Sequence, residues 1–200
     1  MKNLFTPENA AMLLIDHQIG TMDWVRSAKL SDIEMNTIVL AKAAKATNIP
    51  LVLTASMEDQ AQGPLFDKLQ KTVPEAYAQR VLRAGQVDCM MDDHFVKAVQ
   101  ATGRKKLIMA GITTDVCIVY PAITAIEEGY QVQVVVDACG SPTALADQIA
   151  LRRMENAGVT LTTTNQLIAE LAQNWGSTHG SILIGILFED ILLFRNYNLE

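Results

Sequence analysis

The chain has 200 residues, half of them hydrophobic, and carries a formal net charge of −6. This length and composition predict one packed globular domain and exclude an intrinsically disordered chain. The acidic balance argues against nucleic acid or an anionic membrane as a partner, since both bind basic patches.

The first half of the chain alternates short apolar runs with helical patterns. Residues 10–15 form a continuous apolar run, which is typical of a strand buried on both faces, and Asp16 follows at its end. The other elements that we expect before residue 105 are a loop at 17–30, a helix at 33–47, a strand at 51–54, a loop at 56–64, a short helix at 65–71, a link at 74–79, an extended segment at 80–83 and a helix at 94–102.

The second half continues the same alternation. The expected elements are a strand at 106–111, a helix at 117–128, a strand at 130–136, a helix at 142–156, a strand at 159–163 and a helix at 165–175. Strands that alternate with helices across short turns predict an α/β fold, with a parallel sheet covered by helices on both faces. Ligands bind at the carboxyl edge of such a sheet, where we expect Asp16, Arg83 and the segment that ends at Cys117.

The C-terminal segment differs in composition from the domain before it. We take residues 1–176 as the domain and residues 177–200 as an apolar tail. Its longest apolar stretch is interrupted by Glu189 and Asp190 and is too short to span a bilayer, so we expect no membrane partner. The tail either packs back on its own domain or is buried against another subunit. We favour the second alternative.

Cys117 is the candidate nucleophile, because it follows a strand and a glycine turn at the expected start of a helix. The positive end of a helix dipole lowers the pKa of a thiol and favours the thiolate. Asp16 is the candidate base and Arg83 the candidate cation. Each has a simpler interpretation: Cys117 as a small core residue, Asp16 as a helix cap and Arg83 as a surface salt-bridge residue.

The sequence offers no pattern for a metal or a cofactor. The three cysteines are widely spaced, and His94 and His179 do not stand at ligand spacing from His17. The segment after Gly111 lacks the glycines of a dinucleotide-binding loop and the lysine of a phosphate-binding loop. An odd number of cysteines without a signal-peptide pattern indicates a reduced, cytoplasmic protein.

Three segments in this order resemble the isochorismatase-like cysteine hydrolase superfamily, and its YcaC-type subgroup in particular. They are LLIDHQ at 13–18, VLR at 81–83 and AGITTDVCI at 110–118. The resemblance implies a Rossmann-like three-layer α/β/α sandwich around a six-stranded parallel sheet. It also implies a catalytic triad, carried over here as Asp16, Arg83 and Cys117. Most of the superfamily has lysine at the basic position, whereas arginine resembles the YcaC-type pattern.

The resemblance has further implications for the turn before Cys117. It implies a cis peptide bond between Ile112 and Thr113, and an oxyanion hole formed by the backbone N–H groups of Thr113 and Cys117. Metal-using relatives carry a histidine set that this sequence does not match, so no metal is carried over. Because arginine stays charged, Arg83 is expected to orient and stabilise while Asp16 transfers the proton.

These features together predict a cysteine hydrolase that cleaves a C–N bond of a small amide, imide or carbamoyl-like substrate through a thioester. The alternative is an oligomeric protein of the same fold that binds a small molecule or carries a redox-responsive thiol. The residues expected to line the substrate pocket are Gln18, Trp24, Met57 and Glu58. The tail and the YcaC-type resemblance both indicate a homo-oligomer, specifically an octamer.

Overall fold

The computed structural model describes residues 4–192 and contains one six-stranded sheet in which all strands are parallel. The strand order is β3-β2-β1-β4-β5-β6. The strands are β1 (Ala10–Ile15), β2 (Leu51–Ser56), β3 (Val81–Arg83), β4 (Lys106–Gly111), β5 (Gln131–Val135) and β6 (Thr160–Thr162). This is the doubly wound order of a Rossmann-like sheet, so the predicted fold class is confirmed.

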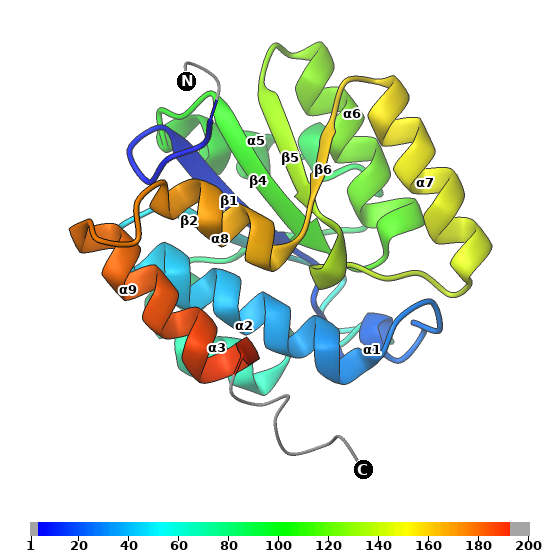
Figure 1. The fold of residues 1–200 in the computed structure, drawn as a ribbon. Coiled ribbons are helices and arrows are strands. Elements are labelled where there is room, and N and C mark those ends of the chain that lie inside the picture. The colour runs from blue at the N-terminus through cyan, green and yellow to red at the C-terminus, as the bar shows by residue number, and fades with distance from the viewer. Residues whose placement is uncertain (1–3, 193–200) are drawn as a thin grey trace.

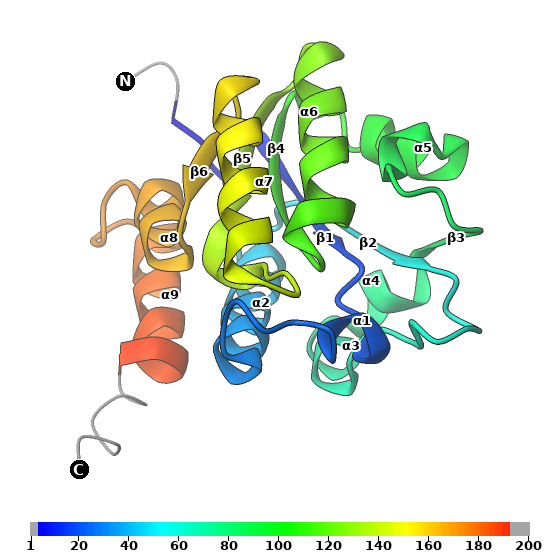
Figure 2. The same ribbon diagram turned by 90° about the vertical axis from the view of Figure 1, so that its right-hand side faces the viewer.

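Helices cover both faces of the sheet, so the sheet is the middle layer of a three-layer sandwich (Figures 1 and 2). One face carries α2 (Leu30–Ala46), α3 (Asp67–Thr72), α8 (Thr164–Ala172) and α9 (Thr178–Leu187). The other carries α5 (Asp93–Ala101), α6 (Val119–Glu127) and α7 (Ala144–Asn156). Asp92 caps α5 by accepting the N–H groups of His94 and Phe95, each at 2.9 Å.

The centre of the sheet is fully apolar. Every residue of β1 is buried, because this strand has a neighbour on each side and a helical layer on each face. Ile15 is level with Thr54 of β2 and with Gly111 of β4. A Cβ atom on Gly111 would lie 2.2 Å from the carbonyl oxygen of Ile15, so only glycine fits here. Asp16 therefore leaves the sheet between the ends of β2 and β4.

Two short helices occupy segments that were expected to lack regular structure. Helix α1 (Ile19–Met22) lies within the predicted loop at 17–30, and α4 (Pro74–Ala78) replaces the predicted link at 74–79. One helical turn is too short to show a hydrophobic period, which explains the first difference. In α4, proline stands at the first helical position, where its fixed φ and missing N–H are tolerated.

The described part of the tail packs on its own domain. Helix α9 contacts α2 and α8, and its Leu183 and Leu187 are buried in the same core as the sheet. Lys42 of α2 also forms a salt bridge with Asp190 at 2.7 Å. Packing on its own domain does not exclude contacts with another subunit through the exposed residues of this segment. A role of the tail at an oligomer interface stays a prediction, and residues 193–200 lie outside the described residues.

Within residues 4–192, no helix combines the length and the apolar character that crossing a bilayer requires.

Candidate active site

Asp16 lies at the carboxyl end of β1, at the middle of the sheet edge. Its φ angle of 55° is in the left-handed region, which is uncommon for residues other than glycine and is found repeatedly at active sites. The N–H of Asp16 donates to the carbonyl oxygen of Thr54 at 3.0 Å, which fixes this turn to β2. The side chain is fully buried, so its carboxyl group lies below the molecular surface.

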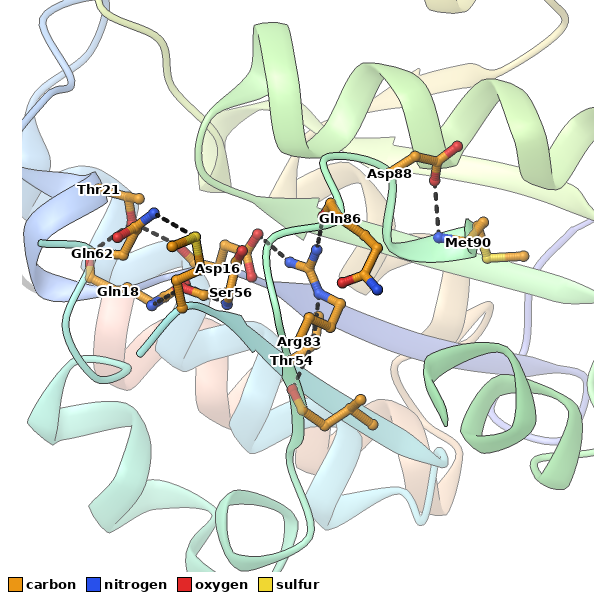
Figure 3. Close-up of polar contacts among 12 residues, drawn as sticks. Asp16, Gln18, Thr21, Thr54, Ser56, Gln62, Arg83, Gln86, Asp88 and Met90 are labelled. Carbon is orange, nitrogen blue, oxygen red and sulfur yellow. Dashed lines mark hydrogen bonds and ion pairs between the residues drawn. The ribbon is translucent and has the colours of Figure 1, made fainter. Parts of the chain in front are cut away.

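Arg83 ends β3, and hydrogen bonds hold its guanidinium group on three sides (Figure 3). Nε donates to Oγ1 of Thr54 at 2.9 Å, Nη1 donates to the carbonyl oxygen of Gln86, and Nη2 donates to Oδ2 of Asp16. The side chains of Arg83 and Asp16 are 0% and 1% exposed. The pair is therefore a buried salt bridge, and the simpler interpretation of Arg83 as a surface residue is wrong.

Cys117 lies in a π-helical turn, Thr114–Ile118, between β4 and α6. The N–H of Ile118 donates to the carbonyl oxygen of Thr113, five residues earlier, at 3.2 Å. The sequence pattern predicts that Cys117 begins the α-helix. This prediction is wrong, because α6 starts only at Val119. Single π-turns occur frequently at functional sites. The peptide bond between Ile112 and Thr113 is cis, the form that the resemblance implies.

The three side chains form one interacting group. The Cys117 thiol is close enough to the Asp16 carboxyl for each to shift the pKa of the other, and Arg83 influences both. Arg83 occupies Oδ2 of Asp16. The other oxygen, Oδ1, is buried and has no hydrogen-bond partner among residues 4–192. Oδ1 is therefore the atom that is available to accept the thiol proton.

The pKa of the Cys117 thiol shifts in the direction opposite to the one expected. This pKa is raised to about 12, chiefly by burial and also by the negative charge of Asp16. The backbone N–H of Thr113, which hydrogen-bonds the sulfur, and the charge of Arg83 act the other way. Burial also raises the pKa of Asp16, against the effect of Arg83. The resting thiol is protonated at neutral pH, beside a carboxylate of increased basicity.

The family model of the Isochorismatase domain matches residues 10–166, a range that includes Asp16, Arg83 and Cys117. The chain belongs to the isochorismatase family.

Relatives place this isochorismatase-family chain near YcaC proteins. It is 39% identical to the probable hydrolase YcaC of Escherichia coli over 167 residues, which cover 84% of this chain and 79% of that protein. The crystal structure of the E. coli YcaC gene product, described as an octameric hydrolase of unknown specificity, matches with a TM-score of 0.91 and 36% identity over 98% of this chain and 95% of that one. YcaC from Pseudomonas aeruginosa, solved with hexane-2,5-diol and covalent acrylamide, matches with a TM-score of 0.90 and 35% identity over 98% and 96%. The predicted YcaC-type resemblance and the hydrolase class are confirmed.

The other two cysteines of this isochorismatase-family domain are fully buried. The Cys139 sulfur accepts the N–H of Gly111 at 3.4 Å and donates to the carbonyl oxygen of Val135 at 3.2 Å. Burial raises the pKa of Cys139 to about 12 and that of Cys89 well above its ordinary value. Both are small core side chains, in agreement with the preference for Cys117 as the reactive thiol.

The four side chains expected in the substrate pocket divide into two pairs. Met57 and Glu58 line an open groove of about 490 Å³ that Arg83 also lines, with Asp59, Gln60, Leu82 and Ala84. Gln18 instead bonds the backbone of Ser56, accepting its N–H at 2.8 Å and donating to its carbonyl oxygen at 2.9 Å. Trp24 is 48% exposed and does not line this groove. The substrate contacts of all four stay a prediction.

The groove has an apolar wall and a partly neutralised acidic wall. Oε2 of Glu58 accepts the Nε of Arg80 at 2.9 Å, so this carboxylate is compensated within the chain. Met57 has a φ angle of 47°, and its sulfur lies against Gly85, where a Cβ would be only 3.1 Å away. The turn that begins at Met57 thus holds a residue other than glycine in the left-handed region of backbone angles.

Two residues that support the site were not singled out from the sequence. Thr54 receives the hydrogen bond from Arg83, and Ser141 connects three loops at the sheet edge. The Ser141 hydroxyl accepts the N–H of Asp115 at 3.2 Å, and its carbonyl oxygen accepts the N–H groups of Arg26 and Ser27. The only sequence signal for Thr54 was its position as a polar residue at the end of an apolar strand.

Across the described part of the chain, His, Cys, Asp and Glu side chains form no group of three or more that could hold a metal ion.

Proposed function

We propose that this isochorismatase-family hydrolase cleaves the C–N bond of a small amide, imide or carbamoyl-like substrate, with Cys117 as the nucleophile and Asp16 as base and acid. The observation that carries the proposal is the buried Asp16 carboxyl group, which interacts with the Cys117 thiol while Arg83 holds Oδ2 and Oδ1 has no hydrogen-bond partner among the described residues. A carboxylate in this position can take a proton from the thiol without moving.

Attack on the substrate begins from the neutral thiol. The S–H proton moves to Oδ1 of Asp16 as the sulfur forms a bond to the carbonyl carbon, so no free thiolate has to accumulate. The oxygen of the tetrahedral intermediate accepts the N–H groups of Thr113 and Cys117. Support for Thr113 comes from its N–H, which already hydrogen-bonds the Cys117 sulfur.

The reaction then completes in two further steps. Asp16 returns its proton to the substrate nitrogen, the C–N bond breaks, and the amine leaves a thioester on Cys117. Asp16 next removes a proton from a water molecule, whose oxygen attacks the thioester carbon. The C–S bond breaks, the carboxylic acid leaves, and the proton on Asp16 returns to the sulfur. Arg83 stays charged throughout and keeps Asp16 oriented.

An activity screen tests this proposal directly. The purified protein is incubated with a panel of small amides, imides and carbamoyl compounds, and release of ammonia or amine is measured beside the Cys117→Ala variant. We expect turnover of at least one compound by the native protein alone, with a thioester on Cys117 detected by mass spectrometry. Turnover that survives in Cys117→Ala would overturn the mechanism.

One observation favours the alternative of a protein that binds or senses rather than hydrolyses. The pKa of Cys117, raised to about 12, leaves little thiolate at neutral pH. The covalent acrylamide on the P. aeruginosa relative favours a reactive nucleophile in that protein instead, since acrylamide is an electrophile. Alkylation of Cys117 at pH 7 no faster than that of a buried cysteine would support the alternative.

We propose that the protein acts as a homo-oligomer, specifically an octamer, on a small-molecule substrate in the cytoplasm. The octameric E. coli relative supports the assembly, and the three free cysteines support a reducing compartment. Phe188 and Leu192, at the end of the described tail, are 49% and 41% exposed. If the tail is interfacial, Phe188→Glu will lower the native mass on light scattering, whereas an exposed control, Lys97→Glu on α5, will not. An unchanged mass for Phe188→Glu would remove the tail from the interface.

A further inference from the structure

Thr54 lies near the carboxyl end of β2 and is fully buried. Its hydroxyl group has two partners: it donates to the carbonyl oxygen of Val81 at 2.9 Å and accepts the Nε–H of Arg83 at 2.9 Å (Figure 3). A hydroxyl has a single hydrogen, and Val81 takes it. A lone pair of the oxygen is therefore fixed in the direction of Arg83.

This arrangement fixes the plane of the guanidinium group. The five N–H groups of an arginine form a rigid fork, so the direction of Nε–H determines the directions of the other four. Nε donates to Thr54, and Nη1 donates to the carbonyl oxygen of Gln86. Only one N–H of Nη2 then reaches Asp16. The result is a single contact to Oδ2, which leaves Oδ1 without a complete hydrogen bond among the described residues.

A merely structural role accounts poorly for this hydroxyl. Thr54 and Val81 are already paired in the ladder between β2 and β3, so their strands do not need the side-chain bond to associate. Valine suits a buried strand position as well as threonine does and brings no polar atom into the core. Valine would lose two hydrogen bonds, the one to the Val81 carbonyl oxygen and the one from Arg83, and only the second reaches the site.

We propose that Thr54 is a positioning residue, which orients Arg83 so that the cation binds one oxygen of Asp16 and leaves the other for the Cys117 proton. This inference rests on the proposed function. Without the hydroxyl, the guanidinium can rotate toward the bidentate pairing that arginine and carboxylates favour. It would then occupy Oδ1 as well and compete with proton transfer from the thiol.

Alkylation of Cys117 by iodoacetamide tests the inference without a known substrate. The rate is measured from pH 5 to pH 9 by mass spectrometry of the Cys117 peptide, in the native protein, Thr54→Val and Thr54→Ser. In Thr54→Val we expect a rate about tenfold lower at pH 7, the effect of losing one hydrogen bond to a charged group, and a profile moved to higher pH. Thr54→Ser, which keeps the oxygen, should restore both within about twofold.

Thr37→Val is the matched control, because Thr37 is also fully buried and its hydroxyl donates to the carbonyl oxygen of Ile33 at 2.8 Å, within α2. It should lower thermal stability without moving the profile. A Thr54→Val profile that matches the native one would overturn the inference while leaving the proposed function intact. Native Cys117 that reacts no faster than Cys139 would contradict both. If Thr54→Val does not fold, the same alkylation profile is measured for Thr54→Ala, which also lacks the hydroxyl group.

Discussion

Cys117 and Cys139 follow neighbouring strands of one sheet, and burial raises the pKa of both thiols to about 12. Their partners differ. The Cys139 sulfur lies between the N–H of Gly111 and the carbonyl oxygen of Val135, so both of its hydrogen-bond partners are backbone groups. Cys117 has the Asp16 carboxyl and the Arg83 cation beside it.

Under the proposed mechanism, a raised pKa does not by itself separate a nucleophilic thiol from a core thiol, because both thiols have it. A thiol that must lose its proton during attack needs an acceptor within reach, and a raised pKa is then compatible with catalysis. Backbone carbonyl groups can hold a thiol proton but cannot take it.

The largest effect is expected from the two cysteines themselves. Cys117→Ala should lower turnover of any substrate found by at least about 10³-fold, because the bond-forming atom is absent. Cys139→Ala should leave turnover within about threefold and cost roughly 1–2 kcal/mol of unfolding free energy through the lost core contacts. Steady-state rates and urea denaturation measure the two quantities. Equal losses of turnover in both variants would contradict the different roles that we assign to Cys117 and Cys139.

The next effect concerns two carboxyl groups at the sheet edge, the buried Asp16 and the half-buried Asp137. Asp16→Asn leaves Arg83 as an uncompensated buried cation, which should lower the unfolding free energy by roughly 3–5 kcal/mol and abolish turnover. Asp137 is the matched control, because its Oδ1 accepts the N–H and hydroxyl of Thr164, each at 2.8 Å, and burial raises its pKa.

Asp137→Asn keeps an oxygen that can accept these bonds. We therefore expect a cost below about 1 kcal/mol and nearly native turnover. Urea denaturation and activity assays compare the two variants. If Asp16→Asn were as mild as Asp137→Asn, Asp16 would have no special connection to Arg83 or Cys117.

His17 provides a pH-dependent test, since it resembles Cys139 in having a backbone carbonyl as its partner. Its Nε2 lies 2.9 Å from the carbonyl oxygen of Ala138, and burial lowers its pKa from 6.5 to about 4. The unfolded chain therefore binds a proton at His17 that the folded chain does not between these two pH values. Stability must fall as pH falls through this window, by roughly 3 kcal/mol in total.

The measurement is urea denaturation at several pH values from 4 to 7.5. His17→Gln should remove this part of the pH dependence, whereas His94→Gln, at an exposed position on α5, should leave it unchanged. If the unfolding free energy of His17→Gln depends on pH as steeply as that of the native protein, another residue takes up the proton.

The sequence predicted the positions of the strands more accurately than those of the short helices. The runs at 10–15 and 106–111 coincide with β1 and β4, because strands buried on both faces allow only apolar residues. Helix α1 and helix α4 were missed because one or two turns carry too little pattern. The apolar composition of the tail was recognised from the sequence, but helix α9 was not predicted, and its burial against α2 and α8 depends on the completed sandwich.

The site was readable in its residue types but not in its contacts. The resemblance selected Asp16, Arg83 and Cys117, and the structure brings them together at one edge. The sign of the Cys117 pKa shift was missed, because desolvation depends on burial by distant segments rather than on the local helix pattern. Thr54 was missed for a similar reason, since its partner Arg83 lies on another strand.

The salt bridge between Arg83 and Asp16 joins residues 67 positions apart, and the Cys117 turn follows a strand that pairs with β1. In a chain whose central strands have not yet associated, the three thiols have no such neighbours and differ little in chemical environment. A brief alkylation pulse during refolding would then label all three alike, and selectivity for Cys117 would emerge only when the sheet is complete. Cys117, the proposed nucleophile, would then report on folding, because its distinctive reactivity would arise with the tertiary structure.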